Sequence, residues 1–253
     1  MSTTFLIEAK SRNVNGHLLT LPSQDFGDTC VRMIDFWDWS HFEDKPYIFK
    51  FIEYTDEPTL IDRFKQYDNA IPIGSVEFVL AWFKVIGIKN VKPLNIPKEL
   101  WHFCDREIAI GHTKDFNGVY MLKDLEVIKS EYNDCVKLNN NIYYPEDKEF
   151  FLSEWLNDVI SEWRVFVFNG EIKDIKCYSG DFWKLPDKDY IEKIVKEYNN
   201  PSYTLDVMVT PNKTEILELH DFFSCGLYGF EDTILPLMWK RSIKNIIKRY
   251  KNI

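Results

Sequence analysis

The chain has 253 residues, of which 45% are hydrophobic and 16% aromatic, and this content is enough to bury a sizeable core in one large domain or two closely packed ones. Its formal net charge of −9 argues against a nucleic acid as the main partner, because nucleic-acid binding depends on clustered lysine and arginine residues. No run of roughly 18 apolar residues and no secretory signal pattern occurs, so we expect neither a membrane span nor export.

The five cysteines show no CxxC spacing and no pairing with histidines. An odd number of scattered cysteines in a chain of this length does not indicate a disulfide framework. We therefore expect free thiols and a cytoplasmic location, where the environment is reducing.

The first part of the chain alternates strand and helix patterns. Residues 4–9 and 47–53 are short apolar runs typical of strands, and residues 58–67 and 76–86 carry apolar positions at helical spacing. Ser75 is suited to be the N-cap of the second of these helices. This order predicts an α/β fold for the N-terminal part.

From residue 107 onward, short strand patterns predominate. Residues 108–110, 118–121 and 150–155 are β-like runs, and residues 124–130 have the pattern of a small helix. We therefore expect an α+β arrangement after the α/β part.

The strongest local signal is a hairpin. Residues 161–168 and 171–178 alternate in polarity, and the Asn169-Gly170 pair between them suits a type I′ turn. Because side chains alternate along a strand, Glu162 and Arg164 are expected on one face. By itself, this pair is equally consistent with a cross-strand salt bridge and with a ligand site.

A second strand pair carries two carboxylates. After a predicted helix over residues 188–198, antiparallel pairing of residues 203–209 with 215–220 places Asp206 and Glu218 on neighbouring strands. Two carboxylates can share one Mg²⁺ ion, which prefers oxygen ligands. Taken alone, the pattern favours ordinary outward-facing residues of alternating strands.

Two other segments have simpler interpretations. The basic run from Lys240 to Lys251 is interpreted as an amphipathic helix with a solvated face, with a small charge-steering site as the alternative. The aromatic cluster Phe36-Trp37-Asp38-Trp39 is interpreted as core packing or a homodimer contact rather than a substrate pocket.

Several segments, taken in order, resemble the ATP-grasp superfamily, in particular a compact clade of uncharacterised ATP-grasp proteins of phages and bacteria. The resemblance spans roughly residues 70 to 230 and depends on the order of its motifs. The motifs are Ile71-Pro72-Ile73-Gly74-Ser75, Lys114-Asp115-Phe116-Asn117-Gly118, Ser153-Glu154-Trp155-Leu156, Ser161-Glu162-Trp163-Arg164-Val165, Tyr203-Thr204-Leu205-Asp206-Val207, Leu217-Glu218-Leu219-His220 and Cys225-Gly226-Leu227-Tyr228-Gly229.

The resemblance implies an ATP-grasp fold in which residues 1–100 form a small N-terminal α/β domain. Residues 101–253 would form the nucleotide-binding module of two α+β subdomains, with ATP between them. Glu154, Trp155 and Leu156 would be the hinge that contacts the adenine.

The resemblance also implies roles for the charged residues. Glu162 would lie near the ribose or a metal-bound water, and Lys114 would reach a phosphate. Arg164 would be the catalytic cation at the phosphate or acyl phosphate. Asp206 and Glu218 would bind Mg²⁺.

The sequence departs from the family pattern at two places. His220 stands where the family usually has asparagine, and we include it among the metal ligands although an imidazole nitrogen suits Mg²⁺ less well than an amide oxygen. A Lys-Pro pair is absent around residues 108–112, so Arg106 or Lys176 would supply the missing phosphate contact.

The implied activity is an ATP-dependent ligase that activates a carboxylate as an acyl phosphate and joins it to an amine, with ATP and Mg²⁺ as cofactors. The partners would be small-molecule or peptide carboxylates and amines. Two alternatives stay open: a phosphotransferase on the same fold, and a catalytically inactive nucleotide-binding protein.

Overall fold

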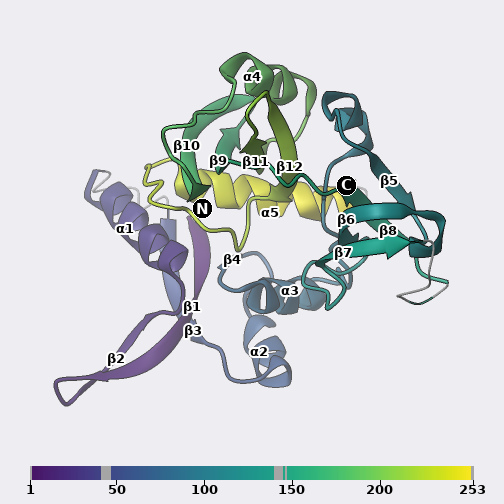
Figure 1. Ribbon diagram of the computed structural model, residues 1–253. Helices are drawn as coiled ribbons and strands as arrows, with labels where there is room; N and C mark the ends of the chain where they lie inside the picture. Colours follow the sequence, from purple (N-terminus) through teal and green to yellow (C-terminus); the bar gives the residue numbers. More distant parts are fainter. Residues whose placement is uncertain (1, 41–46, 140–144, 146, 252–253) are drawn as a thin grey trace. The chain divides into compact units, whose positions relative to one another are not determined.

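The computed structural model describes residues 2–40, 47–139, 145 and 147–251 (Figure 1). Its internal contacts divide the chain into two compact units, the first made of residues 1–89 and 222–253 and the second of residues 90–221. This division differs from a single boundary at residue 100, because the last segment of the chain packs with the first unit.

The first unit contains a four-stranded sheet. Strand β1 lies between β2 and β3, pairs antiparallel with β2 and parallel with β3, and also pairs parallel with β4. The elements of this unit are β1 (Thr3–Val14), β2 (His17–Pro22), α1 (Asp25–Ser40), β3 (Tyr47–Glu53), α2 (Glu57–Phe64), β4 (Ile71–Ile73), α3 (Val76–Val85) and α5 (Leu235–Lys251).

The predicted strands and helices of the first unit are present. The Ser75 hydroxyl accepts a hydrogen bond from the Phe78 backbone N–H at 3.3 Å, which confirms the predicted N-cap. The hairpin between β1 and β2 was not predicted, although its turn is an Asn15-Gly16 pair with φ of 53° and 84°. This is the same turn signal that identified the later hairpin.

Helix α5 accounts for the return of the chain to the first unit. It contacts α1 and β4, and its Trp239 ring packs on Phe222 with the ring centroids 5.5 Å apart. Of the aromatic cluster on α1, Trp37 donates a hydrogen bond from Nε1 to the Thr233 carbonyl at 2.8 Å, whereas Trp39 is 68% exposed.

The second unit contains two antiparallel sheets. The first has the strand order β5-β8-β6-β7, and two short 3₁₀ helices, η1 and η2, lie before β5 and β6 in the sequence. Its elements are η1 (Lys98–Phe103), β5 (Ile108–Gly111), η2 (Thr113–Asp115), β6 (Asn117–Asp124), β7 (Asp134–Asn139) and β8 (Phe150–Glu154).

The predicted helix over residues 124–130 is wrong. Strand β6 continues to Asp124, whose carboxylate accepts hydrogen bonds from the backbone N–H groups of Glu126 at 2.8 Å and Val127 at 3.2 Å. A side chain that bonds the following backbone in this way stabilises a turn instead of a helix. Lys148 forms an ion pair with the same carboxylate at 2.7 Å.

The second sheet has the strand order β10-β9-β11-β12, and α4 packs on one of its faces. The hairpin turn at Asn169-Gly170 has φ of 51° and 76°, as predicted. The elements are β9 (Ser161–Phe168), β10 (Glu171–Gly180), α4 (Lys188–Glu197), β11 (Ser202–Val209) and β12 (Thr214–Asp221).

Helix α4 determines which face of this sheet is free for polar side chains. Ile191 and Ile194 of α4 share an apolar core with Val165 of β9 and Leu205 of β11. Because side chains alternate along a strand, the residues next to these point to the opposite face. That face carries the charged residues of the candidate site.

Candidate functional site

A row of four charged residues crosses the second sheet from edge to edge. The strand registers place Lys176 of β10 opposite Arg164 of β9, Arg164 opposite Asp206 of β11, and Asp206 opposite Glu218 of β12. Directly opposed residues on neighbouring strands lie on the same face. The sheet therefore gathers two cations and two carboxylates, and the predicted adjacency of Asp206 and Glu218 is confirmed.

Irregular residues border this charged row. On β10 the register shifts between Cys177 and Ser179, which leaves Tyr178 as an extra residue. On β12 it shifts beside Glu218, which leaves Leu217 as an extra residue. β-Bulges of this kind re-aim side chains and are frequent next to functional sites.

Arg164 and Asp206 form a buried, two-point ion pair. The Arg164 Nε donates to Oδ1 of Asp206 at 2.8 Å, and Nη2 donates to Oδ2 at 2.7 Å. Their side chains are 9% and 2% exposed. This is the cross-strand salt bridge that the sequence left open for Arg164.

Tyr178 lies close to this pair. The Arg164 guanidinium carbon is 5.8 Å from the centre of its ring. Burial raises the pKa of Tyr178, and the carboxylates of Asp206 and Glu162 raise it further, so its hydroxyl stays protonated. Glu162 also accepts a hydrogen bond from it, so the predicted site residue Glu162 lies beside Tyr178.

Glu218 is held by a lysine that the sequence analysis missed. Lys123, from β6 of the other sheet, forms an ion pair with Glu218. Burial lowers the pKa of Lys123 to about 8. No motif marked this residue, and the only signal was that a lysine ends the alternating run of β6 while the expected lysine near residue 108 is absent.

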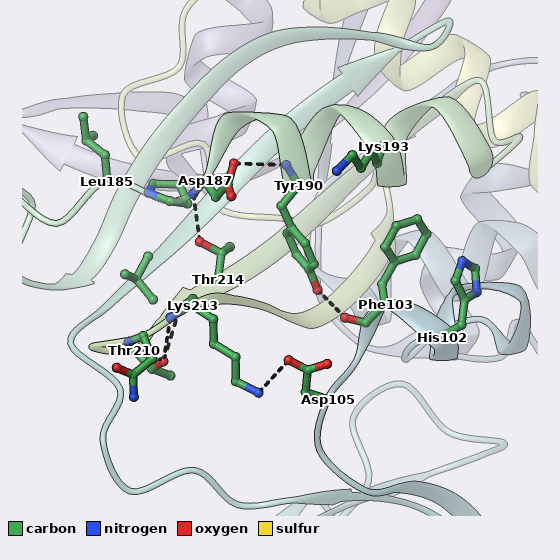
Figure 2. Close-up of a pocket in the computed structure, with 13 residues that line it drawn as sticks. His102, Phe103, Asp105, Leu185, Asp187, Tyr190, Lys193, Thr210, Lys213 and Thr214 are labelled. Atoms are coloured by element: carbon green, nitrogen blue, oxygen red, sulfur yellow. Dashed lines mark hydrogen bonds and ion pairs between the residues drawn. The ribbon is translucent and has the colours of Figure 1, made fainter.

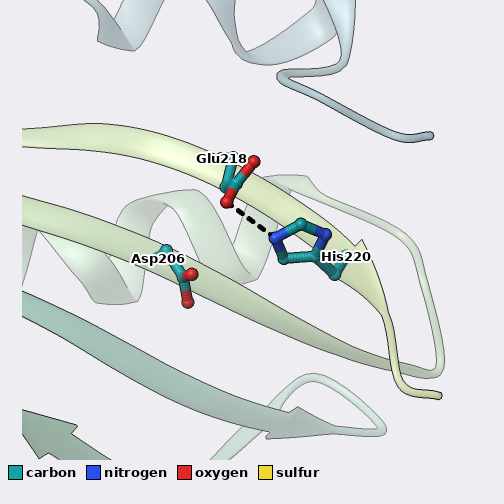
Figure 3. A group of neighbouring side chains, drawn as sticks. All are labelled: Asp206, Glu218 and His220. Carbon is teal, nitrogen blue, oxygen red and sulfur yellow. Dashed lines mark ion pairs between the residues drawn. The ribbon is translucent and has the colours of Figure 1, made fainter. Parts of the chain in front are cut away.

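His220 completes a group of side chains that could hold a metal ion (Figure 3). Ligand atoms of Asp206, Glu218 and His220 all lie within 4.8 Å of one another, and His220 Nε2 is 2.8 Å from a Glu218 oxygen. Burial lowers the pKa of His220 to about 4, which leaves the imidazole neutral at pH 7. Two carboxylate oxygens suit Mg²⁺, and a neutral imidazole can be a third ligand.

Thr204 adds a hydroxyl without a protein partner. It is fully buried, lies opposite His220 in the strand register, and its Oγ1 makes no hydrogen bond to any described residue. A buried hydroxyl that lacks a partner costs free energy unless a ligand satisfies it. The site therefore has unused hydrogen-bonding capacity beside its carboxylates.

The two cations considered as replacements for the missing lysine differ in their surroundings. Arg106 is buried and bonds to Ser153 Oγ at 2.7 Å, Glu215 Oε2 at 3.0 Å and the Ile216 carbonyl at 2.6 Å. All three of its side-chain nitrogens are thus used by the protein. Lys176 lies in the charged row, and its side chain is 31% exposed and pairs with Asp174.

The predicted hinge connects the two sheets of the second unit. Glu154 ends β8, and its carboxylate accepts a hydrogen bond from the Glu107 backbone N–H at 3.1 Å. The Trp155 side chain is 40% exposed, Leu156 is half-buried, and residues 155–160 form no strand before β9 begins. This geometry is compatible with a flexible connection that exposes backbone groups.

Lys114 is exposed on η2, just before β6. Within the described ranges, no hydrogen bond or ion pair joins it to the charged row.

A separate cavity of about 690 Å³ lies on the α4 side of the sheet (Figure 2). Tyr190 and Lys193 of α4 line it, and the Tyr190 hydroxyl donates to the Phe103 carbonyl at 2.8 Å. Lys213 pairs with Asp105 at 3.1 Å. Because α4 covers the face opposite Arg164 and Asp206, this cavity is distinct from the charged row.

Comparison with known families identifies the chain. Residues 122–234 match a family described as an ATP-grasp domain, the second family of its clade. The chain belongs to the ATP-grasp superfamily. The matched segment contains Lys123 and every member of the charged row, so these residues lie within the ATP-grasp domain.

Comparison with solved structures supports the ATP-grasp fold. D-alanine–D-alanine ligase from Bacillus anthracis superposes with a TM-score of 0.50 at 12% identity, covering 100% of this chain and 98% of that one. L-amino acid ligase from Bacillus licheniformis gives 0.47 at 9% identity (94% and 73%), and phosphoribosylglycinamide synthetase from Anaerococcus prevotii gives 0.46 at 10% (95% and 76%). Identities this low show the fold alone. No match was found among curated proteins.

The described residues include no helix that is long and apolar enough to cross a membrane.

Proposed function

We propose that this ATP-grasp protein is an ATP-dependent ligase that forms a carbon–nitrogen bond between a carboxylate and an amine. The charged row carries the proposal. It gathers two carboxylates suited to a divalent cation and two cations suited to phosphate groups on one sheet face of the ATP-grasp domain.

In this proposal Asp206, Glu218 and His220 hold Mg²⁺. The bound cation neutralises charge on the β- and γ-phosphates of ATP. The carboxylates fit this cation because Mg²⁺ prefers hard oxygen ligands, and the neutral His220 imidazole either binds it or holds one of its water ligands.

Other residues bind the nucleotide. Lys123 takes the place of the family's missing lysine, because its ammonium group already lies at Glu218 and its side chain is 16% exposed. The hinge contacts the adenine with backbone groups, and apolar side chains cover the ring. The proposed nucleotide-binding residues are Lys114, Lys123, Glu154, Trp155, Leu156, Glu162 and Lys176.

The reaction has two steps. An oxygen of the substrate carboxylate attacks the γ-phosphorus of ATP, the bond to the β-phosphate oxygen breaks, and ADP leaves. The amine then attacks the carbonyl carbon of the acyl phosphate, inorganic phosphate leaves, and the amine loses a proton. The protein contributes positioning and charge neutralisation.

Product analysis with a panel of acids and amines tests the proposal. We expect ADP release that requires both an acid and an amine, and a product whose mass equals acid plus amine minus water. A phosphorylated product without an amide would instead select the phosphotransferase alternative.

The third alternative is a nucleotide-binding protein without turnover, and His220 in a metal position is the observation that favours it. Tight Mg-ATP binding with no acceptor-dependent ADP release across the panel would select this alternative. Replacement of His220 by Asn, the usual family residue, would then be expected to raise turnover.

The proposed partners are small-molecule or peptide acids and amines, and we propose no nucleic-acid or membrane partner. All five cysteines are free, which supports the proposed cytoplasmic location. A homodimer stays a proposal that sedimentation analysis would test.

A further inference from the structure

The pairing of Arg164 with Asp206 suggests a role for this arginine other than phosphate contact. We infer that Arg164 is a positioning residue: it fixes the Asp206 carboxylate in the orientation that the cation site needs, and it does not contact the transferred phosphoryl group. This inference rests on the proposed function, in which Asp206 binds Mg²⁺.

The geometry of the pair supports positioning. Two guanidinium nitrogens meet the two carboxylate oxygens at 2.8 and 2.7 Å, so the planes of both groups are fixed relative to each other. Each carboxylate oxygen carries a second lone pair, which leaves Asp206 able to bind a cation while it stays paired. Arg164 and Asp206 are also direct neighbours on adjacent strands.

Burial explains why Asp206 needs a permanent partner. The residue is 1% exposed, and a buried carboxylate without a nearby positive charge would be costly or would take up a proton. Arg164 keeps the carboxylate ionised before any metal arrives. Glu218 is more exposed, at 20%, and its partner is Lys123.

The same contacts argue against a phosphoryl contact for Arg164. Its Nε and Nη2 are both engaged by Asp206, and its side chain is only 9% exposed. A move toward phosphate would leave Asp206 buried and unpaired. Lys123 and Lys176 are more accessible, at 16% and 31% exposed, and can reach an anion at lower cost.

The deciding variant is Arg164→Lys, which keeps the positive charge but lacks the two-pronged guanidinium. Loss of a residue that orients a metal ligand typically weakens metal binding by about 10- to 100-fold. We therefore expect the Mg²⁺ concentration that half-saturates calorimetric ATP binding to rise at least about tenfold. The turnover number at saturating Mg²⁺ should stay within about twofold of the parent, because no transition-state contact is lost.

A double-mutant cycle assigns the effect to Asp206. In an Asp206→Asn background, Arg164→Lys should produce no further change in the Mg²⁺ dependence. Arg32→Lys is the matched control, because Arg32 also forms carboxylate ion pairs but lies in the first unit. It should bind Mg-ATP like the parent.

Two results would overturn the inference. One is a large fall in turnover number for Arg164→Lys at saturating Mg²⁺ with an unchanged Mg²⁺ dependence. The other is an Arg164→Lys effect that persists in full in the Asp206→Asn background. If the parent itself shows no Mg²⁺-dependent ATP binding, the proposed function fails instead, and the two failures are distinguishable.

A measurement on the parent protein covers the case in which Arg164→Lys does not fold. In a crystal structure with Mg²⁺ and a non-hydrolysable ATP analogue, Arg164 should still hold both oxygens of Asp206. An Arg164 guanidinium bonded to the γ-phosphate, with Asp206 released, would disprove the positioning role.

Discussion

Asp206 and Glu218 are neighbours in the sheet but differ in what stabilises them. Asp206 is buried and paired to an arginine of the adjacent strand, whereas Glu218 is paired to a lysine from a different sheet and to His220. Replacement of either carboxylate leaves a cation without its partner, and the cost is larger where the partner is more buried.

The proposed metal ligands can be tested by isosteric changes. Asp206→Asn and Glu218→Gln should each weaken Mg-ATP binding strongly, by about tenfold or more, because an amide provides no charge to a divalent cation. Isothermal titration calorimetry in the presence and absence of Mg²⁺ measures this. Circular dichroism serves as the folding control, and unchanged Mg-ATP binding in both variants would refute the site assignment.

Thr204 gives a residue-scale prediction that concerns stability. Its buried hydroxyl has no partner among the described residues, so Thr204→Val removes an unsatisfied polar group with little change of shape. We expect the unliganded protein to be as stable as the parent or more stable by about 1 kcal/mol. Chemical denaturation measures this, and a loss of more than about 1 kcal/mol would show that the hydroxyl has a structural partner.

At the scale of secondary-structure elements, the two glycines that bracket β10 differ in what restricts them. Gly170 has φ of 76°, and a Cβ there would meet nothing within 4 Å. Gly180 has φ of 80°, and a Cβ there would lie 2.1 Å from the Ile160 carbonyl oxygen. The first is limited by backbone conformation alone, and the second also by a close approach of two chain segments.

These two glycines form a matched pair of variants. Gly170→Ala should lower the free energy of unfolding by about 1 kcal/mol, the usual cost of a left-handed conformation for an L-residue. Gly180→Ala should cost several times more, on the order of 3 kcal/mol, because backbone must also move. Urea unfolding measures both, and equal losses would contradict the close approach at Ile160.

The turn that follows β6 gives a pH-dependent prediction. Burial by itself would raise the pKa of Asp124, but hydrogen bonds from Lys148 and the Glu126 backbone outweigh it and lower the pKa to about 2. A carboxyl whose pKa is lower in the folded state stabilises the fold above its unfolded pKa of about 4. This stabilisation, about 2 kcal/mol, is lost as the pH falls from about 4 to 2.

Asp124→Asn removes that titration. The variant should be less stable than the parent at pH 7, and the difference should shrink as the pH falls toward 2. Chemical unfolding at a series of pH values measures the difference. A difference that stays constant between pH 7 and pH 2 would show that Asp124 is not the titrating group.

Much of the element pattern and part of the site follow from local sequence. Asn169-Gly170 fixes a hairpin because both residues accept positive φ, and the short β11–β12 connection fixes which residues face each other, so Asp206 and Glu218 could be placed together. The helix predicted after β6 failed because the Asp124 side chain competes for the backbone N–H groups.

The rest of the site depends on tertiary structure. Lys123 meets Glu218 across 95 residues and two different sheets, and no periodicity encodes that contact. Arg164 was assigned to phosphate from the family pattern, but its closest partner depends on the pairing of β9 with β11, which are separated by β10 and α4 in sequence. Pairing of strands that are distant in sequence cannot be read from local spacing.

At the scale of the whole chain, the first unit is discontinuous, and α5 completes it. Trp239 is 1% exposed and packs on Phe222. Trp239→Ala should lower the stability of the first unit by about 3 to 5 kcal/mol, as for other buried aromatic side chains. Hydrogen exchange should show lost protection in residues 1–89 and 222–251, with much smaller changes in residues 90–221; uniform loss across the chain would contradict two separate cores.

The position of α5 in the sequence also sets an order of events during synthesis. Residues 90–221 leave the ribosome before α5 does, so the unit that carries Arg164, Asp206 and Glu218 has all of its strands available while the first unit still lacks a helix. The N-terminal sheet, although translated first, stays incomplete until the last segment emerges. A ribosome-bound chain stalled soon after residue 221 should therefore have a protease-resistant middle and a protease-sensitive start.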